Sequence, residues 1–384
     1  MSDELTNELA AGRLEAVPDR ARAFFSGPRL AAGPMLAERT LDGRRGPPDA
    51  EDARRLAARM LRTTSGQVGA AAMSLEYAQA LADQMVDRAQ SALRRLENER
   101  STSALDVHDL VALEAVIHVR GRPALRVQSA RIEPIDPIRH PDSGLWKTYL
   151  ADVSAKLFAA CQATGAIRWR KTDHAVDDLR LQGTAWLVAP DRAVTNRHVV
   201  FPPDAASWVR RKASEPTRGS VKSDVVAHLD FARDDGKARE LLYEIVSVLY
   251  VAPDEDDVDI AVLEVRPRNP ALLAGKPLAL ATTPQRHVAV IGHPAPLPEL
   301  SHEERLVFGS FDERKRVSFG LVTATDGNGE IYHDASSAGG FSGGGVVDLI
   351  DVHVQGLHYR GAVAQTNRAF STKRLRNHAV SAFL

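Results

Sequence analysis

The chain has 384 residues, which is long for one domain and comfortable for two. Its 49 basic and 50 acidic side chains give a formal net charge of −1, which argues against nucleic acid and acidic membranes as partners. The only cysteine is Cys161, so an intrachain disulfide is excluded. The N-terminal residues are polar and acidic, unlike a signal peptide, and no apolar run reaches spanning length. We therefore expect a cytoplasmic protein without a membrane span.

The first half of the chain changes character at about residue 49. Glycine–proline pairs punctuate residues 1–48 and predict a loosely structured segment. Residues 49–100 are rich in Ala, Leu, Arg and Glu, with apolar residues at three- and four-residue steps that predict a helix face. These face residues are Leu75, Ala78, Leu81, Met85 and Ala89.

Two further elements are expected before the chain changes texture. Residues 114–133 predict two short strands about a turn at 121–123, and residues 145–164 predict another helix. Residues 49–170 are thus interpreted as a mainly helical region with a short β-hairpin. We find no nucleophile, metal cluster or phosphate loop in this region, and we expect neither a cofactor nor a metal.

Residues 171–384 have an all-β texture. Short apolar runs alternate with Gly, Pro, Asp and Asn turns, a spacing typical of β-sandwiches and barrels. The length is sufficient for two six-stranded barrels, and residues 372–384 are helical in character.

Three motifs in this half carry residues suited to nucleophilic catalysis. In residues 183–200, a strand, a Pro-Asp turn and a second strand lead to His198. In residues 257–265, Asp259 precedes the apolar run Ile-Ala-Val-Leu, with Asp257 as the alternative carboxylate. We expect only one of these two carboxylates to face inward with the apolar residues of the strand.

The third motif is the glycine-rich segment of residues 333–348, which contains Ser342 and leads into an apolar strand. A serine among glycines alone is also typical of linkers. Gly340 permits a turn in which its amide and that of Ser342 both point at a developing oxyanion. The order His198, Asp259, Ser342 is that of chymotrypsin-like enzymes and differs from the subtilisin and α/β-hydrolase orders.

From about residue 179 to the C-terminus, the sequence resembles trypsin-like, chymotrypsin-fold serine peptidases, most closely the bacterial glutamyl-endopeptidase-like branch. The resemblance implies a double six-stranded β-barrel. It also implies a triad of His198 as general base, Asp259 as its orienting acid and Ser342 as nucleophile, with an oxyanion hole formed by Gly340 and Ser342. Phe341 replaces the aspartate of digestive zymogens, which implies that activation by a freed N-terminus does not operate.

Specificity is implied by the same resemblance. In the glutamyl branch, a histidine and a hydroxyl residue bind an acidic P1 side chain, and the matching residues here are His358 and Ser337. The alternative is that His358 is a structural residue of its strand. Ser336 stands where a trypsin-type pocket has an acid, which disfavours basic P1 residues, although Asp334 lies nearby.

The leading hypothesis is a serine endopeptidase acting on protein or peptide substrates. The helical region would regulate the protease or bind a regulatory protein partner in a bacterial signalling or defence setting. Two alternatives stay open: a non-catalytic scaffold with a protease fold, and an esterase that uses the same triad.

Overall fold

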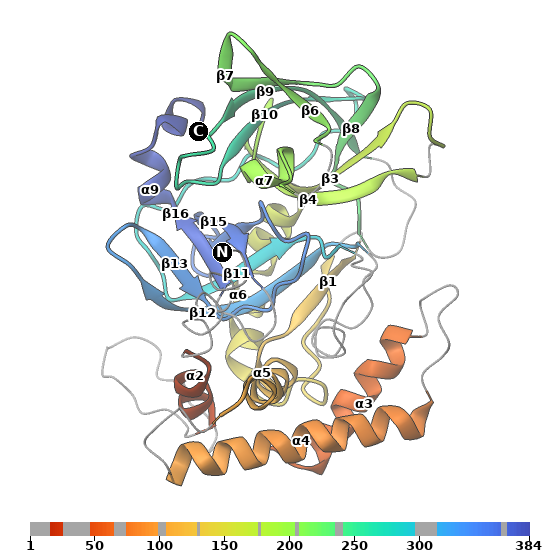
Figure 1. Ribbon diagram of the computed structural model, residues 1–384, viewed down its shortest axis with the longest axis vertical. Coiled ribbons are helices and arrows are strands. Elements are labelled where there is room, and N and C mark those ends of the chain that lie inside the picture. Colours follow the sequence, from red (N-terminus) through yellow and green to blue (C-terminus); the bar gives the residue numbers. More distant parts are fainter. Residues whose placement is uncertain are drawn as a thin grey trace.

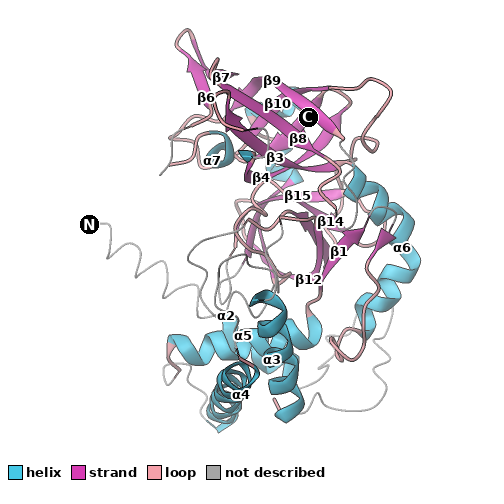
Figure 2. Ribbon diagram, turned by 90° about the vertical axis from the view of Figure 1, so that its right-hand side faces the viewer, coloured by secondary structure: helices cyan, strands magenta, loops and turns pink. Residues whose placement is uncertain are grey.

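A computed structural model describes residues 16–25, 47–64, 74–98, 105–128, 131–175, 178–203, 207–234, 241–295, 313–361 and 367–384. The helices of the first half gather at one end of the molecule, and the strands form two barrels beyond them (Figures 1 and 2). Within the described ranges, the helices of this end are α2 (Ala16–Phe25), α3 (Ala50–Thr64), α4 (Leu75–Asn98) and α5 (Val107–Gly121). Helix α2 lies within the segment that we expected to be loosely structured, so that expectation is wrong for residues 16–25; the rest of 1–46 lies outside the described residues.

Helices α2 to α5 share an apolar core of their own, separate from the cores of the barrels. On α4, Ala78, Met85 and Ala89 are buried as the periodicity predicts, whereas Leu75 is 65% exposed at the first turn. The helical region thus buries most of its apolar side chains among its own helices.

Helix α5 corrects the prediction of a strand before residue 121. Asp106 caps the helix by accepting the amide hydrogen of Asp109, whose carboxylate accepts the amide hydrogen of Asp106 in return. The helix is buried on most of its sides, so its apolar residues form a nearly continuous run that imitates a buried strand. A hairpin does exist, but it follows the helix, with strands β1 (Ala124–Gln128) and β2 (Arg131–Ile132).

The first barrel has six antiparallel strands and is closed by the pairing of β9 with β10. Its strands are β3 (Thr164–Lys171), β4 (Arg180–Ala189), β5 (Arg192–Thr195), β8 (Val225–Asp230), β9 (Leu242–Val251) and β10 (Ala261–Pro267). A hairpin of β6 (Val209–Lys212) and β7 (Glu215–Val221) extends from β9. Since β3 begins at residue 164, the barrels begin before the expected boundary at 171.

The second barrel also has six strands and is closed by the pairing of β11 with β12. Its strands are β11 (His287–Gly292), β12 (Arg316–Thr325), β13 (Glu330–His333), β14 (Gly345–Asp348), β15 (Val354–Arg360) and β16 (Asn367–Ser371). Strand β1 pairs with β12, so the hairpin after α5 extends the sheet of this barrel. The predicted fold class, a double six-stranded barrel after a mainly helical region, is confirmed.

Helix α6 (Gly144–Gln162) packs on a core that joins both barrels, and it confirms the helix predicted there. Trp146 and Leu157 of α6, Trp186 of the first barrel and Phe319 of the second belong to this shared core. The C-terminal helices α9 (Thr372–Arg376) and η2 (Ala379–Phe383) confirm the helical character predicted for residues 372–384. Within the described ranges, no helix combines the length and apolar character needed to cross a membrane.

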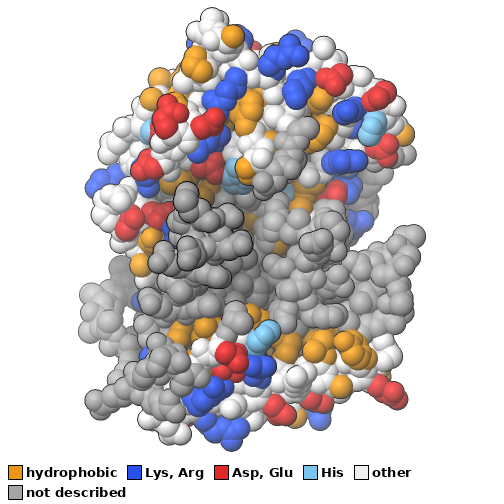
Figure 3. Space-filling view, in the orientation of Figure 1, with side chains coloured by type: hydrophobic (Ala, Val, Ile, Leu, Met, Phe, Trp, Pro, Cys, Tyr) orange, Lys and Arg blue, Asp and Glu red, His pale blue; other side chains and the backbone are white. Residues whose placement is uncertain are grey.

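The surface agrees with the balanced composition. Basic and acidic side chains are intermixed over the visible face of the first barrel (Figure 3).

Candidate active site

His198 lies on a single helical turn, α7 (Arg197–Val200), directly after β5. Its Nδ1 is 2.5 Å from Oδ2 of Asp259, and its backbone amide donates to Oδ1 of the same carboxylate at 3.0 Å. The side-chain amide of Asn196 donates to the Asp259 carbonyl at 2.8 Å. The Asp259 carboxylate is thus bonded to both the side chain and the backbone of His198, which fixes the imidazole relative to the carboxylate.

Two carboxylates of the acidic loop before β10 point to different places. Asp259 faces His198, and its side chain is 17% exposed. Asp257 is 79% exposed and pairs with Arg374 of α9 instead. Asp259 is therefore the carboxylate beside the imidazole. Strand alternation does not separate the two residues, because residues two apart share a face and both precede β10, which begins at Ala261.

The loop that carries Ser342 is held by the first barrel through Thr184 of β4. The Thr184 amide donates to the Ser342 carbonyl at 2.9 Å, and its hydroxyl donates to the Gly340 carbonyl at 2.8 Å. The hydroxyl of Thr195 in turn donates to the Thr184 carbonyl at 2.7 Å. Thr184 therefore links the serine loop to the strand that leads to His198.

Two glycines of the loop have left-handed backbone conformations, Gly340 with φ of 90° and Gly343 with φ of 86°. Side chains other than glycine are strained there. Among the described residues, the amides of Gly340 and Ser342 donate to no acceptor, whereas the intervening Phe341 amide donates to the Ala338 carbonyl. The two amides on either side of Phe341 are thus available to an anionic oxygen.

Ser342 and the turn that carries His198 flank the same glycine of β4. A Cβ built at Gly183 would lie 2.8 Å from methyl groups of Val199, the neighbour of His198, and 3.2 Å from the Ser342 carbonyl oxygen. Among the hydrogen bonds of the described residues, none joins the Ser342 hydroxyl to His198. Catalytic bonds of this kind are often long without substrate and shorten when it binds.

Phe341 is fully buried in an apolar cluster of the second barrel. A Cβ at Gly292 would lie 2.6 Å from its ring. Where digestive zymogens place an aspartate, this chain anchors the loop by apolar packing.

A cleft of about 690 Å³ runs beside His198 and Asp259. The first barrel and its loops contribute Arg197 and Arg211, and the second barrel contributes Glu330 and Tyr359. Tyr359 donates to Glu330, which also accepts a bond from Tyr332 at 2.8 Å. The cleft therefore has charged walls of both signs.

The residues expected to form a P1 pocket are Ser336, Ser337 and His358, and all three are buried. The Ser337 hydroxyl donates to Oδ1 of Asn367 at 2.6 Å, and Nδ2 of Asn367 donates to the Ala335 carbonyl at 2.6 Å. A Cβ at Gly361, at the end of β15, would overlap both the Ser337 hydroxyl and Oδ1 of Asn367. In this conformation the end of β15 lies directly against Ser337.

His358 is 1% exposed, and its Nδ1 lies 3.1 Å from Nε2 of His333, which is also buried. Burial, with further contributions from His333 and His198, holds the pKa of His358 well below its usual range. A neutral His358 can still donate one hydrogen bond. It donates from Nε2 when His333 supplies the hydrogen of the bond between the two rings.

Ser336 is 1% exposed and bonds to the helical region, not to the neighbouring residues of the pocket. Its hydroxyl donates to the Arg122 carbonyl at 2.9 Å and lies 2.6 Å from Nδ1 of His118. Of the pocket residues, the structure therefore groups Ser337 with Asn367 and Gly361, and it places Ser336 on the opposite side of the loop.

Sequence reasoning did not identify Thr184, Asn367, His118 or Arg122. Thr184 is a polar residue within an apolar strand, which could have marked it; the other three act across long stretches of sequence and carry no local signal. Within the described residues, no group of three or more His, Cys, Asp or Glu side chains could hold a metal ion.

Comparisons with known proteins bear on the same part of the chain. A family model described as a trypsin-like peptidase domain matches residues 183–357, which include His198, Asp259 and Ser342. No curated protein matches the sequence.

Solved structures of proteases also match. The active form of the Rv3671c protease from M. tuberculosis is 18% identical, with a TM-score of 0.35 over 58% of this chain and 82% of that one. The serine endoprotease from Yersinia pestis is 16% identical, with a TM-score of 0.36 over 60% of this chain and 64% of that one.

Proposed function

We propose that the protein is a serine endopeptidase in which Ser342 is the nucleophile, His198 the general base and Asp259 the residue that orients the imidazole. The observation that carries the proposal is the Asp259 carboxylate, which bonds to both Nδ1 and the backbone amide of His198. A hydrogen held on Nδ1 leaves Nε2 with a lone pair for the proton of a serine hydroxyl. The family match over residues 183–357 points to the same activity.

The reaction follows from these roles. Oγ of Ser342 attacks the scissile carbonyl carbon while Nε2 of His198 takes the hydroxyl proton, and the carbonyl electrons move onto the oxygen. The amides of Gly340 and Ser342 stabilise this oxyanion. The oxyanion collapses, His198 gives the proton to the leaving amine, and an acyl-enzyme forms. Water then repeats the sequence and releases the acid.

We further propose an acidic P1 preference, because a neutral His358 has one hydrogen to donate, and Ser337 can donate its hydroxyl hydrogen to a substrate carboxylate once that hydrogen leaves Asn367. The alternative is a purely structural His358, which the bond to His333 also supports. In either case Gly361 has to move away from Ser337 for a side chain to enter.

We also propose that the helical region regulates the peptidase activity. This region has its own core, and its last helix contacts the loop before the nucleophile. We also infer a cytoplasmic location, which the single cysteine supports, since secreted domains often rely on disulfides.

A peptide library tests the proposal. Purified protein should cleave peptides after acidic residues, and Ser342→Ala should abolish cleavage, whereas the matched control Ser381→Ala, an exposed serine of η2, should not. Cleavage of esters without peptides would favour an esterase. Cleavage only after Arg or Lys would contradict the roles of Ser337 and His358. Failure to cleave any peptide, with or without added partners, would favour the scaffold.

A further inference from the structure

The end of α5 contacts the loop of residues 334–338, which lies between β13 and the nucleophile. Ser336 and Asp334 of this loop bond to α5 and to the residue that follows it. Ser337 and the turn at Gly340 lie on the same stretch of backbone. The helical region therefore contacts the same loop that carries Ser337 of the candidate P1 pocket.

The first contact is a directional chain of buried hydrogen bonds. Because the single hydroxyl hydrogen of Ser336 goes to the Arg122 carbonyl, Nδ1 of His118 has to donate to the Ser336 oxygen. Nε2 of His118 faces Oε2 of Glu114 at 3.0 Å on the same helix. The acid, imidazole and hydroxyl stand in the order of a hydrolytic triad, but Ser336 is 1% exposed and beyond the reach of a substrate. These hydrogen bonds consequently hold the loop of residues 334–338 in place.

The second contact is a buried ion pair. Nη2 of Arg122 donates to Oδ2 of Asp334 at 2.8 Å, and both side chains are 9% exposed. Oδ1 of Asp334 accepts the amide hydrogen of Leu321 on β12 at 2.6 Å. The guanidinium of Arg122 also lies 5.4 Å from the ring centre of Trp146 on α6. The guanidinium of Arg122 thus contacts both α6 and the loop of residues 334–338.

We infer that His118 and Arg122 are positioning residues, through which the helical region sets the place of Ser337 and hence the width of the P1 pocket. This inference rests on the proposed peptidase function. Ser337 adjoins Ser336 in the chain and lies against Gly361, so a shift of the loop changes the gap between Ser337 and Gly361 directly. Errors of about 1 Å in such positioning can cost ~10²-fold in rate.

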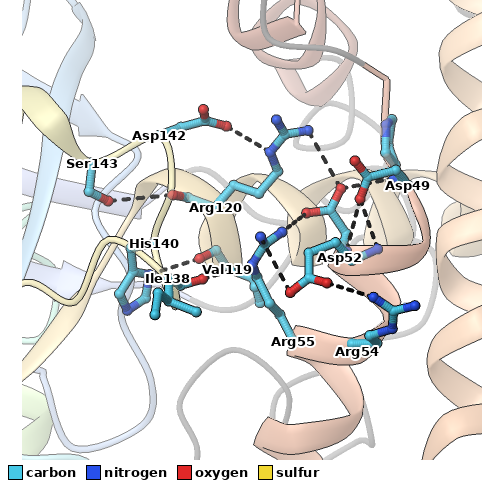
Figure 4. A network of polar contacts seen from close by, with 12 residues as sticks. Asp49, Asp52, Arg54, Arg55, Val119, Arg120, Ile138, His140, Asp142 and Ser143 are labelled. Atoms are coloured by element: carbon cyan, nitrogen blue, oxygen red, sulfur yellow. Dashed lines mark hydrogen bonds and ion pairs between the residues drawn. The ribbon is translucent and has the colours of Figure 1, made fainter.

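Substitution of Arg122 tests the inference against a matched control two residues away. Arg120 bonds to Asp142 at 2.7 Å and pairs with Asp52 of α3 at 3.5 Å, as Figure 4 shows. It lies in the last turn of α5 in a similarly buried ion-pair network, and both of these carboxylates lie outside the loop of residues 334–338. Arg120→Gln therefore removes a buried ion pair whose carboxylates lie outside that loop.

Two rates are measured for each full-length variant: kcat/KM on the best peptide from the library, and labelling of Ser342 by a small fluorophosphonate that lacks a P1 side chain. We expect Arg122→Gln to lower kcat/KM by ~10-fold or more, chiefly through KM, and labelling by less than about threefold. Arg120→Gln should leave both rates within about threefold of the wild type. Asp334→Asn should act as Arg122→Gln does, and the double variant should be no worse than either single variant.

The outcomes separate this inference from the function on which it rests. Equal kcat/KM for the Arg120 and Arg122 variants would overturn the inference, and so would additive losses in the double variant. In both cases an active wild type would still support the peptidase function. If Arg122→Gln does not fold, Ser336→Ala gives the decision: a loss of kcat/KM with retained labelling supports the inference, and unchanged kcat/KM overturns it. A wild type that is neither labelled nor active would overturn both.

Discussion

Replacement of Asp259 by Asn removes one acceptor from a carboxylate that uses two. In the wild type, Oδ2 faces Nδ1 of His198 and Oδ1 accepts the His198 amide hydrogen. Asn has a single carbonyl oxygen, so when that oxygen accepts the amide hydrogen, its NH₂ group faces Nδ1. The imidazole hydrogen then moves to Nε2, where it blocks proton transfer from Ser342.

The loss expected from this change of tautomer is about 10⁴-fold in kcat, or about 5.4 kcal/mol of transition-state stabilisation. The fold should persist, because the backbone carbonyl of residue 259 still accepts the Asn196 amide. Steady-state hydrolysis of the best library peptide measures the rate, and thermal unfolding checks the fold.

Asp257→Asn is the matched control. Asp257 lies two residues away, its side chain is 79% exposed, and it pairs with Arg374. An exposed pair of this kind contributes little, so activity should stay within about fivefold of the wild type. The reasoning is refuted if Asp259→Asn retains more than about a tenth of wild-type activity, or if Asp257→Asn loses as much as Asp259→Asn does.

Three further predictions concern buried groups. Lys315→Met should lower the free energy of unfolding by about 3–5 kcal/mol in urea denaturation, because Nζ of Lys315 donates at 2.8 Å to the carbonyls of both Cys161 and Phe231 and is 1% exposed; a loss under about 1 kcal/mol would contradict this. The thiol of Cys161 should resist iodoacetamide in the native protein at about pH 8 and react after denaturation, as mass spectrometry would show, since burial raises its pKa to about 12; rapid native labelling would be inconsistent with that burial. Burial lowers the pKa of His293 and of His358 well below the usual value, so the unfolded chain binds more protons than the folded one below about pH 6.5, and stability should fall as pH drops from about 7 to 5.5; a His293→Gln variant should show a shallower slope, and an unchanged slope would exclude His293 as a cause.

The parts of the fold that the sequence predicted are those with a local signal. The strand, turn and strand before His198, the acid before β10 and the glycines around Ser342 each occupy a few consecutive residues. Their chemistry and order were therefore readable, whereas the choice of Asp259 over Asp257 depends on the bond between Asp257 and Arg374, which is distant in sequence.

Other features depended on tertiary packing. Helix α5 is surrounded by other elements, so its apolar residues are not confined to one stripe and the helical period is hidden. The bonds from His118 and Arg122 to the loop of residues 334–338 cross more than 200 residues of sequence, and no composition or spacing marks them. The close approach of Gly361 to Ser337 likewise arises only when β15 and β16 are in place.

The central claim is tested most directly by locating the site of a fluorophosphonate adduct. The full-length native protein is treated with the probe, digested and sequenced by mass spectrometry, beside His198→Ala and a heat-denatured sample. We predict one adduct, on Ser342, that is lost on denaturation and falls by at least ~10³-fold in rate in His198→Ala. Absence of labelling at Ser342 in the native protein, or equal labelling without His198, would contradict the proposed triad.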